Sequence, residues 1–146
     1  NIRYLNSLNS VNRNNNLDKR IEKLCNRVET KISKKANSKP RRYSGFNVLS
    51  DYSCHIFNAI LHGSFKLRGF QNKELRFLLI ELGAIPRKQA RNIKKISGQI
   101  TRLIAKLRAH KLVSKLPKTN RYRITQKGEE IIARILLFKK LDLRFC

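Results

Sequence analysis

Residues 94–106 combine side chains that bind phosphate with side chains that recognise base edges. On a helix of 3.6 residues per turn, the polar side of this stretch presents Lys94, Lys95, Ser97, Gln99, Thr101, Arg102 and Lys106. Arg and Gln form paired hydrogen bonds with guanine and adenine in the major groove of duplex DNA. A helix that reads DNA does so with its N-terminal half. We therefore expect Ser97, Gln99 and Arg102 to contact bases, and the lysines to contact phosphates.

A second basic group surrounds a predicted turn. Two runs of β type, 112–116 and 121–125, flank Pro117–Asn120, which is typical of a hairpin. We expect this hairpin to lie on the flanking backbone or in an adjacent minor groove, where narrow A·T tracts concentrate negative potential. The alternative is a turn that only aids solubility. The candidate contact residues here are Lys115, Lys118, Asn120, Arg121 and Arg123.

The balance of charge favours a polyanion as the partner. Of the 146 residues, 34 are Lys or Arg and 9 are Asp or Glu, which gives a formal net charge of +25. No acid occurs between Arg87 and Lys127, whereas a merely solvated face normally mixes both signs of charge. This charge argues against an enzyme that acts alone on a small molecule. Nucleic acid is the expected partner, with duplex DNA favoured over RNA.

No motif indicates catalysis, metal binding or a membrane span. The sequence has no H-E-x-x-H, P-loop or G-x-S-x-G pattern, and His55, His62 and His110 lack the spacing of metal ligands. We expect no enzyme activity, no metal and no cofactor. The three cysteines are far apart, which fits a reducing, cytoplasmic setting. The longest apolar stretch, Ile131–Phe138, is too short to cross a bilayer, and the N-terminus lacks a signal peptide pattern.

The N-terminal third is expected to form an extension and a linker. We expect a basic helical extension over 1–35, a linker over 36–46 and the main domain over 47–146. The stretch Lys34–Arg42 would also suit a flexible arm along phosphates. The chain has no Met, so we expect it to be part of a larger protein. A helix capped by Asn16 is predicted from the spacing of Leu17, Ile21, Leu24, Val28 and Ile32.

The apolar face of that N-terminal helix has two interpretations. Packing against another part of the same protein is the favoured one. The alternative is contact with a second copy of the chain, as a dimerisation helix, or with other domains of a larger protein.

The main domain is expected to begin with two helices. Ser50 and Asp51 start a helix that ends at Gly63, and a short extended stretch covers Phe65–Arg68. Asn72 then caps a second helix, and Gly83 follows its end.

A long basic helix over about 88–110 comes next. It is either continuous or restarts at Ser97, because Gly98 weakens its middle. Its apolar side is formed by Ile93, Ile96, Ile100, Leu103, Ile104 and Leu107. After the hairpin, Thr125 caps a last helix whose buried stripe consists of Ile131, Ile132, Ile135 and Leu136.

Residues Thr101–Ile132 resemble the recognition helix, wing and following helix of MarR-like winged helix-turn-helix domains. The family pattern is Leu-x-x-x-Gly-Leu-Ile, a basic wing, and Tyr-x-Leu-Thr-x-x-Gly; here the two ends are LRAHKLV over 107–113 and YRITQKG over 122–128. Lys111 stands where the family usually has Gly, which predicts a looser end to the helix. The resemblance implies a mainly α fold with a small β-hairpin wing, preceded by a helical extension, and it implies DNA binding.

A looser similarity covers most of the chain. It is similar to the C-terminal part of larger, functionally uncharacterised prokaryotic proteins. In these, a basic segment of the type YLNSL…LDKRIEKL precedes the winged helix, and HGSFKLRGFQNKELR is a landmark. This similarity agrees with a chain that is part of a larger protein, and it implies no activity.

The sequence therefore predicts sequence-preferring binding of duplex DNA. The helix over about 88–110 would enter the major groove, and the wing over 112–125 would lie on the adjacent minor groove and backbone. One alternative is an RNA-binding subunit of a ribonucleoprotein, which would read shape, phosphates and 2′-hydroxyls. Another is the DNA-delivery domain of a mobile-element or defence enzyme whose catalytic part lies elsewhere. A pure protein scaffold is the weakest alternative, because the charge would require an acidic partner.

Overall fold

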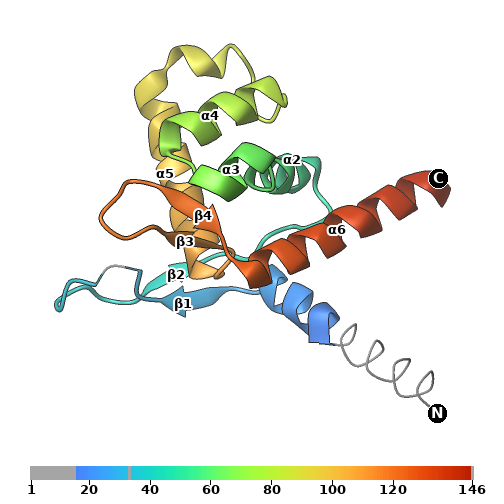
Figure 1. The fold of residues 1–146 in the computed structure, drawn as a ribbon, viewed down its shortest axis with the longest axis horizontal. Helices are drawn as coiled ribbons and strands as arrows, with labels where there is room; N and C mark the ends of the chain where they lie inside the picture. Colours follow the sequence, from blue (N-terminus) through green and yellow to red (C-terminus); the bar gives the residue numbers. More distant parts are fainter. Residues whose placement is uncertain (1–15, 33, 146) are drawn as a thin grey trace.

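The computed structural model describes residues 16–32 and 34–145, with the backbone alone for 141–145. The chain is mainly helical and adds two small antiparallel hairpins, β1–β2 and β3–β4 (Figure 1). This agrees with the predicted mainly α fold with a small β-hairpin. In order, the elements are a helix over 16–25, β1 (Val28–Thr30), β2 (Arg41–Tyr43), α2 (Asp51–Ile60), α3 (Gly63–Arg68), α4 (Asn72–Glu81), a 3-10 helix (Gln89–Arg91), α5 (Ile93–Ala109), β3 (Val113–Lys115), β4 (Tyr122–Ile124) and α6 (Gln126–Phe145).

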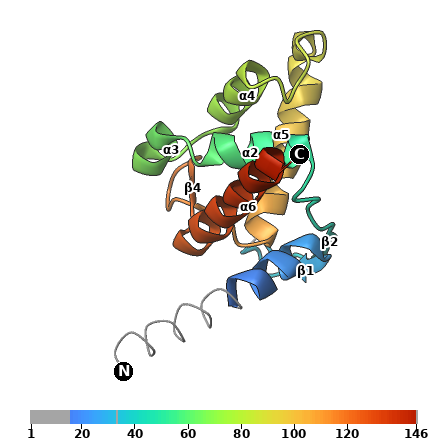
Figure 2. The same cartoon turned by 90° about the vertical axis from the view of Figure 1, so that its right-hand side faces the viewer.

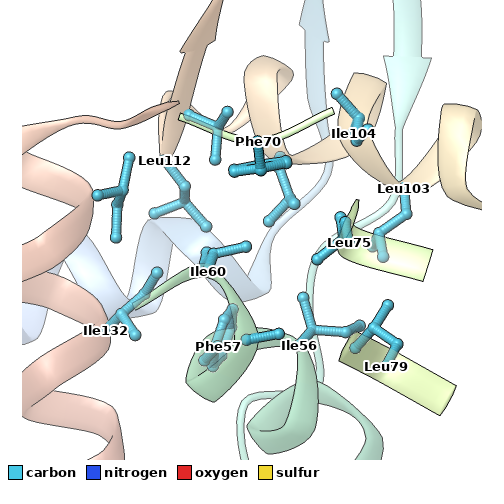
Figure 3. Packing of buried hydrophobic residues seen from close by; sticks show 14 of the residues in the cluster. Ile56, Phe57, Ile60, Phe70, Leu75, Leu79, Leu103, Ile104, Leu112 and Ile132 are labelled. Carbon is cyan, nitrogen blue, oxygen red and sulfur yellow. The ribbon is translucent and has the colours of Figure 1, made fainter. Parts of the chain in front are cut away.

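Helix α2 lies at the centre of the hydrophobic core (Figure 3). Ser50 caps it as predicted, because its hydroxyl accepts a hydrogen bond from the backbone N–H of Ser53 at 3.1 Å. Each of the large apolar side chains buried here contributes roughly 1.5–3 kcal/mol. Around Ile56, Phe57 and Ile60 of α2 pack Phe70, Leu75, Leu79, Leu103, Ile104, Leu112 and Ile132.

Helix α5 packs against α4 and begins later than expected. Asn92 caps it by accepting a hydrogen bond from Lys95 N at 3.2 Å, so the helix starts at Ile93 and not near 88. It runs unbroken through Gly98, so it does not restart at Ser97. Ile93 is 63% exposed and does not belong to the buried side. The other predicted apolar residues of this helix are buried: Ile96, Ile100, Leu103, Ile104 and Leu107.

The end of α5 is closed by a residue with left-handed backbone. Lys111 has φ of +62°, the conformation that glycine adopts at this position elsewhere, as Gly83 does after α4 with φ of +80°. Two hydrogen bonds complete the motif, from Lys111 N to the Arg108 carbonyl at 3.0 Å and from Leu112 N to the Leu107 carbonyl at 3.0 Å. The cap is therefore fully formed in spite of the lysine.

The β3–β4 hairpin and the start of α6 follow the prediction closely. Val113 pairs with Ile124 in the hairpin. Thr125 caps α6, since its hydroxyl accepts from Gly128 N at 2.9 Å. A side chain at Gly128 would collide with the Leu112 carbonyl oxygen, 2.4 Å from where its Cβ would lie. Glycine is therefore needed there because α6 starts against the backbone that leads into β3.

The extended stretch predicted over Phe65–Arg68 is wrong, because these residues are helical and the extended backbone lies at Phe70. Residues 63–68 form α3, which buries Phe65. Gly69, with φ of +72°, then turns the chain so that Phe70 pairs with Tyr122 through two backbone hydrogen bonds of 2.7 and 2.8 Å. Likewise, α4 is capped at Gln71 and not at Asn72, which is its first helical residue.

The N-terminal segment differs more strongly from the prediction. Its helix ends at residue 25 instead of 32, and the cap predicted at Asn16 is wrong because residue 16 is already helical. Val28 and Thr30, which are β-branched, lie in β1 and pair with Tyr43 and Arg41 of β2. The segment expected to be an irregular linker thus contains a strand. The division of the chain into an extension over 1–35, a linker over 36–46 and a domain over 47–146 stays a prediction.

The described part of the N-terminal helix packs on the body of the protein. Leu24 is 3% exposed and belongs to the core, with Leu17 and Ile21 packed against it. The helix lies beneath α6 (Figure 1 and Figure 2), with an ion pair of 3.8 Å between Arg20 and Glu130. This supports the favoured interpretation of its apolar face. Along the described residues, no helix has both the length and the apolar character of a membrane span.

Candidate nucleic-acid interface

The β3–β4 hairpin separates two grooves on the surface of the protein. One, the helix–hairpin groove, lies between α4, α5 and β4. The other, the inter-hairpin groove, lies between the two hairpins and the end of α5. None of the residues that line either groove is Asp or Glu. The helix–hairpin groove is lined by Gln71, Asn72, Lys73, Arg76, Ser97, Thr101, Ile104, Asn120 and Tyr122.

A hydrogen-bond network fixes the wall of the helix–hairpin groove. The side-chain amide of Asn72 donates to Thr101 Oγ1 at 2.9 Å and to the Ser97 carbonyl at 3.1 Å. Thr101 in turn donates to the same carbonyl at 2.9 Å. The start of α4 is thereby joined to the N-terminal half of α5, and the joint presents hydroxyl groups at the groove.

The predicted contact residues of α5 fall on two different flanks. Ser97 and Thr101 line the groove, and Lys94, three residues before Ser97, lies exposed on the same flank. Gln99 lies two residues from Thr101 and is therefore about 160° away from it around the helix axis. The structure brings Ser97, Thr101 and Asn120 together and leaves Gln99 outside the groove.

Lys106 lies on the flank of Gln99 and has an intramolecular partner. Its ammonium nitrogen is 4.3 Å from the centre of the Phe46 ring, a cation–π contact. Burial lowers the pKa of Lys106. Lys95 and Arg102 are exposed on the outer side of α5 and are not among the groove residues.

The hairpin presents its basic residues in different environments. Lys118, at the tip, is exposed and has φ of +57°. Arg121 is half-buried and forms an ion pair of 3.5 Å with Glu74 in the first turn of α4. Lys115 lines the inter-hairpin groove, whereas Arg123 is exposed and lines neither groove. A phosphate would therefore meet Lys118 without an acidic competitor, but would have to displace Glu74 from Arg121.

Four groove residues at the start of α4 were not expected from the sequence. Gln71, Asn72, Lys73 and Arg76 come from a segment in which the sequence predicted a helix and a landmark of the looser similarity, but no contact with nucleic acid. Their proximity to α5 depends on how the two helices pack, which the local sequence pattern does not specify. The one available signal was Asn72 itself, a polar residue placed at a helix start.

Within residues 16–32 and 34–145, no three His, Cys, Asp or Glu side chains lie close enough to hold a metal ion. Comparison of the chain with protein-family models, with curated proteins and with solved structures gives no match in any of the three. The geometry and charge of the grooves are therefore the basis for a functional proposal.

Proposed function

We propose that this chain binds duplex DNA with a preference for sequence, as a winged helix-turn-helix module of a larger protein. In this proposal α4 and α5 are the helix-turn-helix and the β3–β4 hairpin is the wing. The observation that carries the proposal is the helix–hairpin groove, in which hydroxyl and amide groups of α4, α5 and the hairpin converge without any acidic residue.

The dimensions of the elements suit this mode of binding. An α-helix with its side chains is about 10–12 Å across, close to the roughly 12 Å width of the major groove. Lys94, Ser97 and Thr101 lie on the N-terminal half of α5, the half that usually reaches base edges. Lys73 and Arg76 lie across the groove on α4, where they would contact the backbone at the edge of the major groove.

The wing would follow the DNA to the neighbouring minor groove. Its tip, with Lys118 and Asn120 exposed, is the part that a narrow minor groove would attract. Leu116 N donates to the Arg121 carbonyl at 2.9 Å, and the Thr119 hydroxyl donates to the Leu116 carbonyl at 3.0 Å. These bonds hold the tip in one conformation, which lowers the entropy lost on binding.

Duplex RNA is a poorer match to the same groove. The major groove of A-form RNA is too deep and narrow for a helix, and recognition of single-stranded RNA relies on exposed aromatic side chains. The helix–hairpin groove has one aromatic residue in its lining, Tyr122, whose ring is packed against Phe70 and Arg108. RNA binding is therefore kept as an outcome of the test and not as a second proposal.

Fluorescence anisotropy across a salt series tests the proposal. The purified chain is titrated into labelled duplex DNA, duplex RNA and single strands of equal length. We expect duplex DNA to bind most tightly, with the preference retained near physiological salt. Equal affinity for every polyanion, lost in parallel as salt rises, would mean that charge alone drives the binding and would overturn the proposal.

A pair of charge-matched variants shows whether the proposed surface is responsible. Lys73→Ser with Lys94→Ser removes one cation that lines the helix–hairpin groove and one that lies exposed on the same flank of α5. Lys19→Ser with Lys140→Ser removes two cations elsewhere. The first pair should weaken binding to duplex DNA well beyond the second. Equal losses would contradict the assignment of this surface.

A further inference from the structure

The inter-hairpin groove is more strongly basic than the helix–hairpin groove. Nine Lys or Arg side chains line it, and no acid does. They come from three separate parts of the chain: the β1–β2 hairpin, the end of α5 and the β3–β4 hairpin. The proposed contact of α5 and the wing with DNA does not use the first of these.

The β1–β2 hairpin turns its cationic face toward this groove. Thr30 pairs with Arg41, and both line the groove. Glu29 pairs with Arg42 on the opposite face of the two strands, where the side chains form an ion pair of 3.5 Å. The single acid of the hairpin is thus directed away from the groove.

The part of the groove formed by α5 includes two small side chains. Ala105 and Ala109 of α5 line it, and their short side chains leave room for a chain of phosphates to approach the helix. Arg108 also lines the groove, and its guanidinium lies 5.7 Å from the centre of the Tyr122 ring of β4. Arg108 therefore lies against the β3–β4 hairpin, which separates the two grooves.

The two hairpins extend from the same side of the protein, one above the other (Figure 1). A minor groove is bounded by two sugar–phosphate backbones about 6 Å apart, so an element that enters it has one backbone on each side. The β3–β4 hairpin likewise has one acid-free groove on each side. If the hairpin enters a minor groove, the inter-hairpin groove is therefore on the side where the second backbone of the DNA would lie.

We propose that the inter-hairpin groove holds the second sugar–phosphate backbone of a bound duplex, with the β1–β2 hairpin as a phosphate-binding arm. The inference rests on the proposed binding of duplex DNA and adds a second contact surface to it. It predicts a bound duplex longer than the segment that α5 and the wing alone would cover.

The salt dependence of binding tests this arm directly. Each phosphate contact contributes roughly 0.9 to the slope of log K against log salt for duplex DNA and about 0.7 for single strands. The arm variant is Lys31→Ser, Lys34→Ser, Lys39→Ser, three exposed groove residues. The control is Lys19→Ser, Lys23→Ser, Lys140→Ser, three exposed lysines on the N-terminal helix and α6. Unfolding curves of all three proteins establish that the fold is kept.

We expect the arm variant to lower the slope on a 24-base-pair duplex by about 2–3, since three contacts are lost. The control should change it by less than about 1, and the loss on a single strand should be much smaller than on the duplex. An arm variant that matches the control on duplex DNA would overturn the arm while leaving the proposed function intact. An equal loss on single strands would overturn the assignment to a second backbone. A wild-type chain without preference for duplex DNA would instead overturn the proposed function.

Discussion

The side-chain amide of Asn72, the first residue of α4, donates a hydrogen bond of 2.9 Å to the hydroxyl of Thr101 on α5. Because the same amide also bonds to the Ser97 carbonyl, the two helices are joined at the point where the helix–hairpin groove opens. This contact lies on the flank of α5 that lines the groove. The flank of Thr101 lines it, and the flank of Gln99 does not.

Thr101 should influence sequence preference more than Gln99 does. Thr101→Val keeps the size of the side chain but removes its hydroxyl, whereas Gln99→Leu removes a polar group on the opposite flank. A good base contact is worth roughly 1–3 kcal/mol of discrimination. We expect Thr101→Val to reduce the ratio of affinities for a selected and a scrambled duplex by about fivefold or more, and Gln99→Leu to leave it within twofold. If Gln99→Leu instead reduces this ratio more than Thr101→Val does, the side of α5 opposite the core would be the surface that contacts bases.

The hairpin cations should differ in their effect on affinity. Lys118→Ala removes an exposed charge at the tip, so it should weaken binding to all duplexes alike and lower the salt slope by about 0.9. Arg121→Ala should have a smaller effect, because Glu74 already lies 3.5 Å from the guanidinium. Anisotropy titrations in 50–200 mM salt measure both.

Removing the acid beside Arg121 should strengthen DNA binding. Glu74→Gln keeps the shape of the side chain and releases Arg121 from its ion pair. We expect tighter binding to every duplex and a steeper salt slope, both abolished when Arg121→Ala is added. Unchanged affinity in Glu74→Gln would show that Arg121 lies outside the bound interface.

The end of α5 offers a test of stability. Lys111 has a left-handed backbone, which costs a non-glycine residue about 1 kcal/mol. Lys111→Gly should therefore raise the free energy of unfolding by about 1 kcal/mol, measured by urea denaturation. Lys111→Ala removes the same charge but keeps the strained backbone, so it should give no such gain. Equal stabilities of the Gly and Ala variants would contradict the strain argument.

The cap at Lys111 also illustrates what the sequence could predict. The hairpin of β3 and β4, the cap at Thr125 and the buried side of α5 from Ile96 onward depend on local spacing and on turn residues, so the sequence was sufficient for them. The left-handed lysine was predicted only as a weaker cap. The surrounding packing imposes the conformation that glycine would adopt more readily.

Features that depend on distant contacts were missed or misplaced. The sequence predicts that the N-terminal helix continues to residue 32, because its apolar spacing continues that far. In the structure, Val28 and Thr30 instead pair with β2, so the helix ends at residue 25. The groove-facing flank of α5 could not be predicted, since it depends on how α4 packs against α5, where Asn72 bonds to Thr101. The sequence likewise did not predict the ion pair between Arg121 and Glu74, because the two residues are far apart along the chain. It did show that no acid lies between Arg87 and Lys127.

Stability should fall as the pH is lowered through the range where His110 titrates. Burial, and secondarily the charge of Lys106, lower the pKa of His110 below its usual value, although a hydrogen bond of 2.8 Å with the Ser44 carbonyl opposes this. Below about pH 6.5 the unfolded chain therefore binds a proton that the folded chain does not. The free energy of unfolding should decrease as the pH drops from 7 toward 5.

A neutral replacement isolates this histidine from His55 and His62. His110→Gln keeps a donor for the Ser44 carbonyl but cannot be protonated. The difference between wild type and variant in urea denaturation at several pH values should therefore shrink as the pH falls. A constant difference would mean that His110 has the same pKa in the folded and unfolded chain.

Mapping the bound surface by NMR tests the central claim most directly. A uniformly ¹⁵N-labelled chain is titrated with duplex DNA, and the amide shifts are followed residue by residue. We predict the largest shifts in residues 71–76, 94–101 and 115–123, which include most of the helix–hairpin groove and the hairpin tip. Shifts concentrated instead on the helix over 16–25 and on α6 would contradict the account.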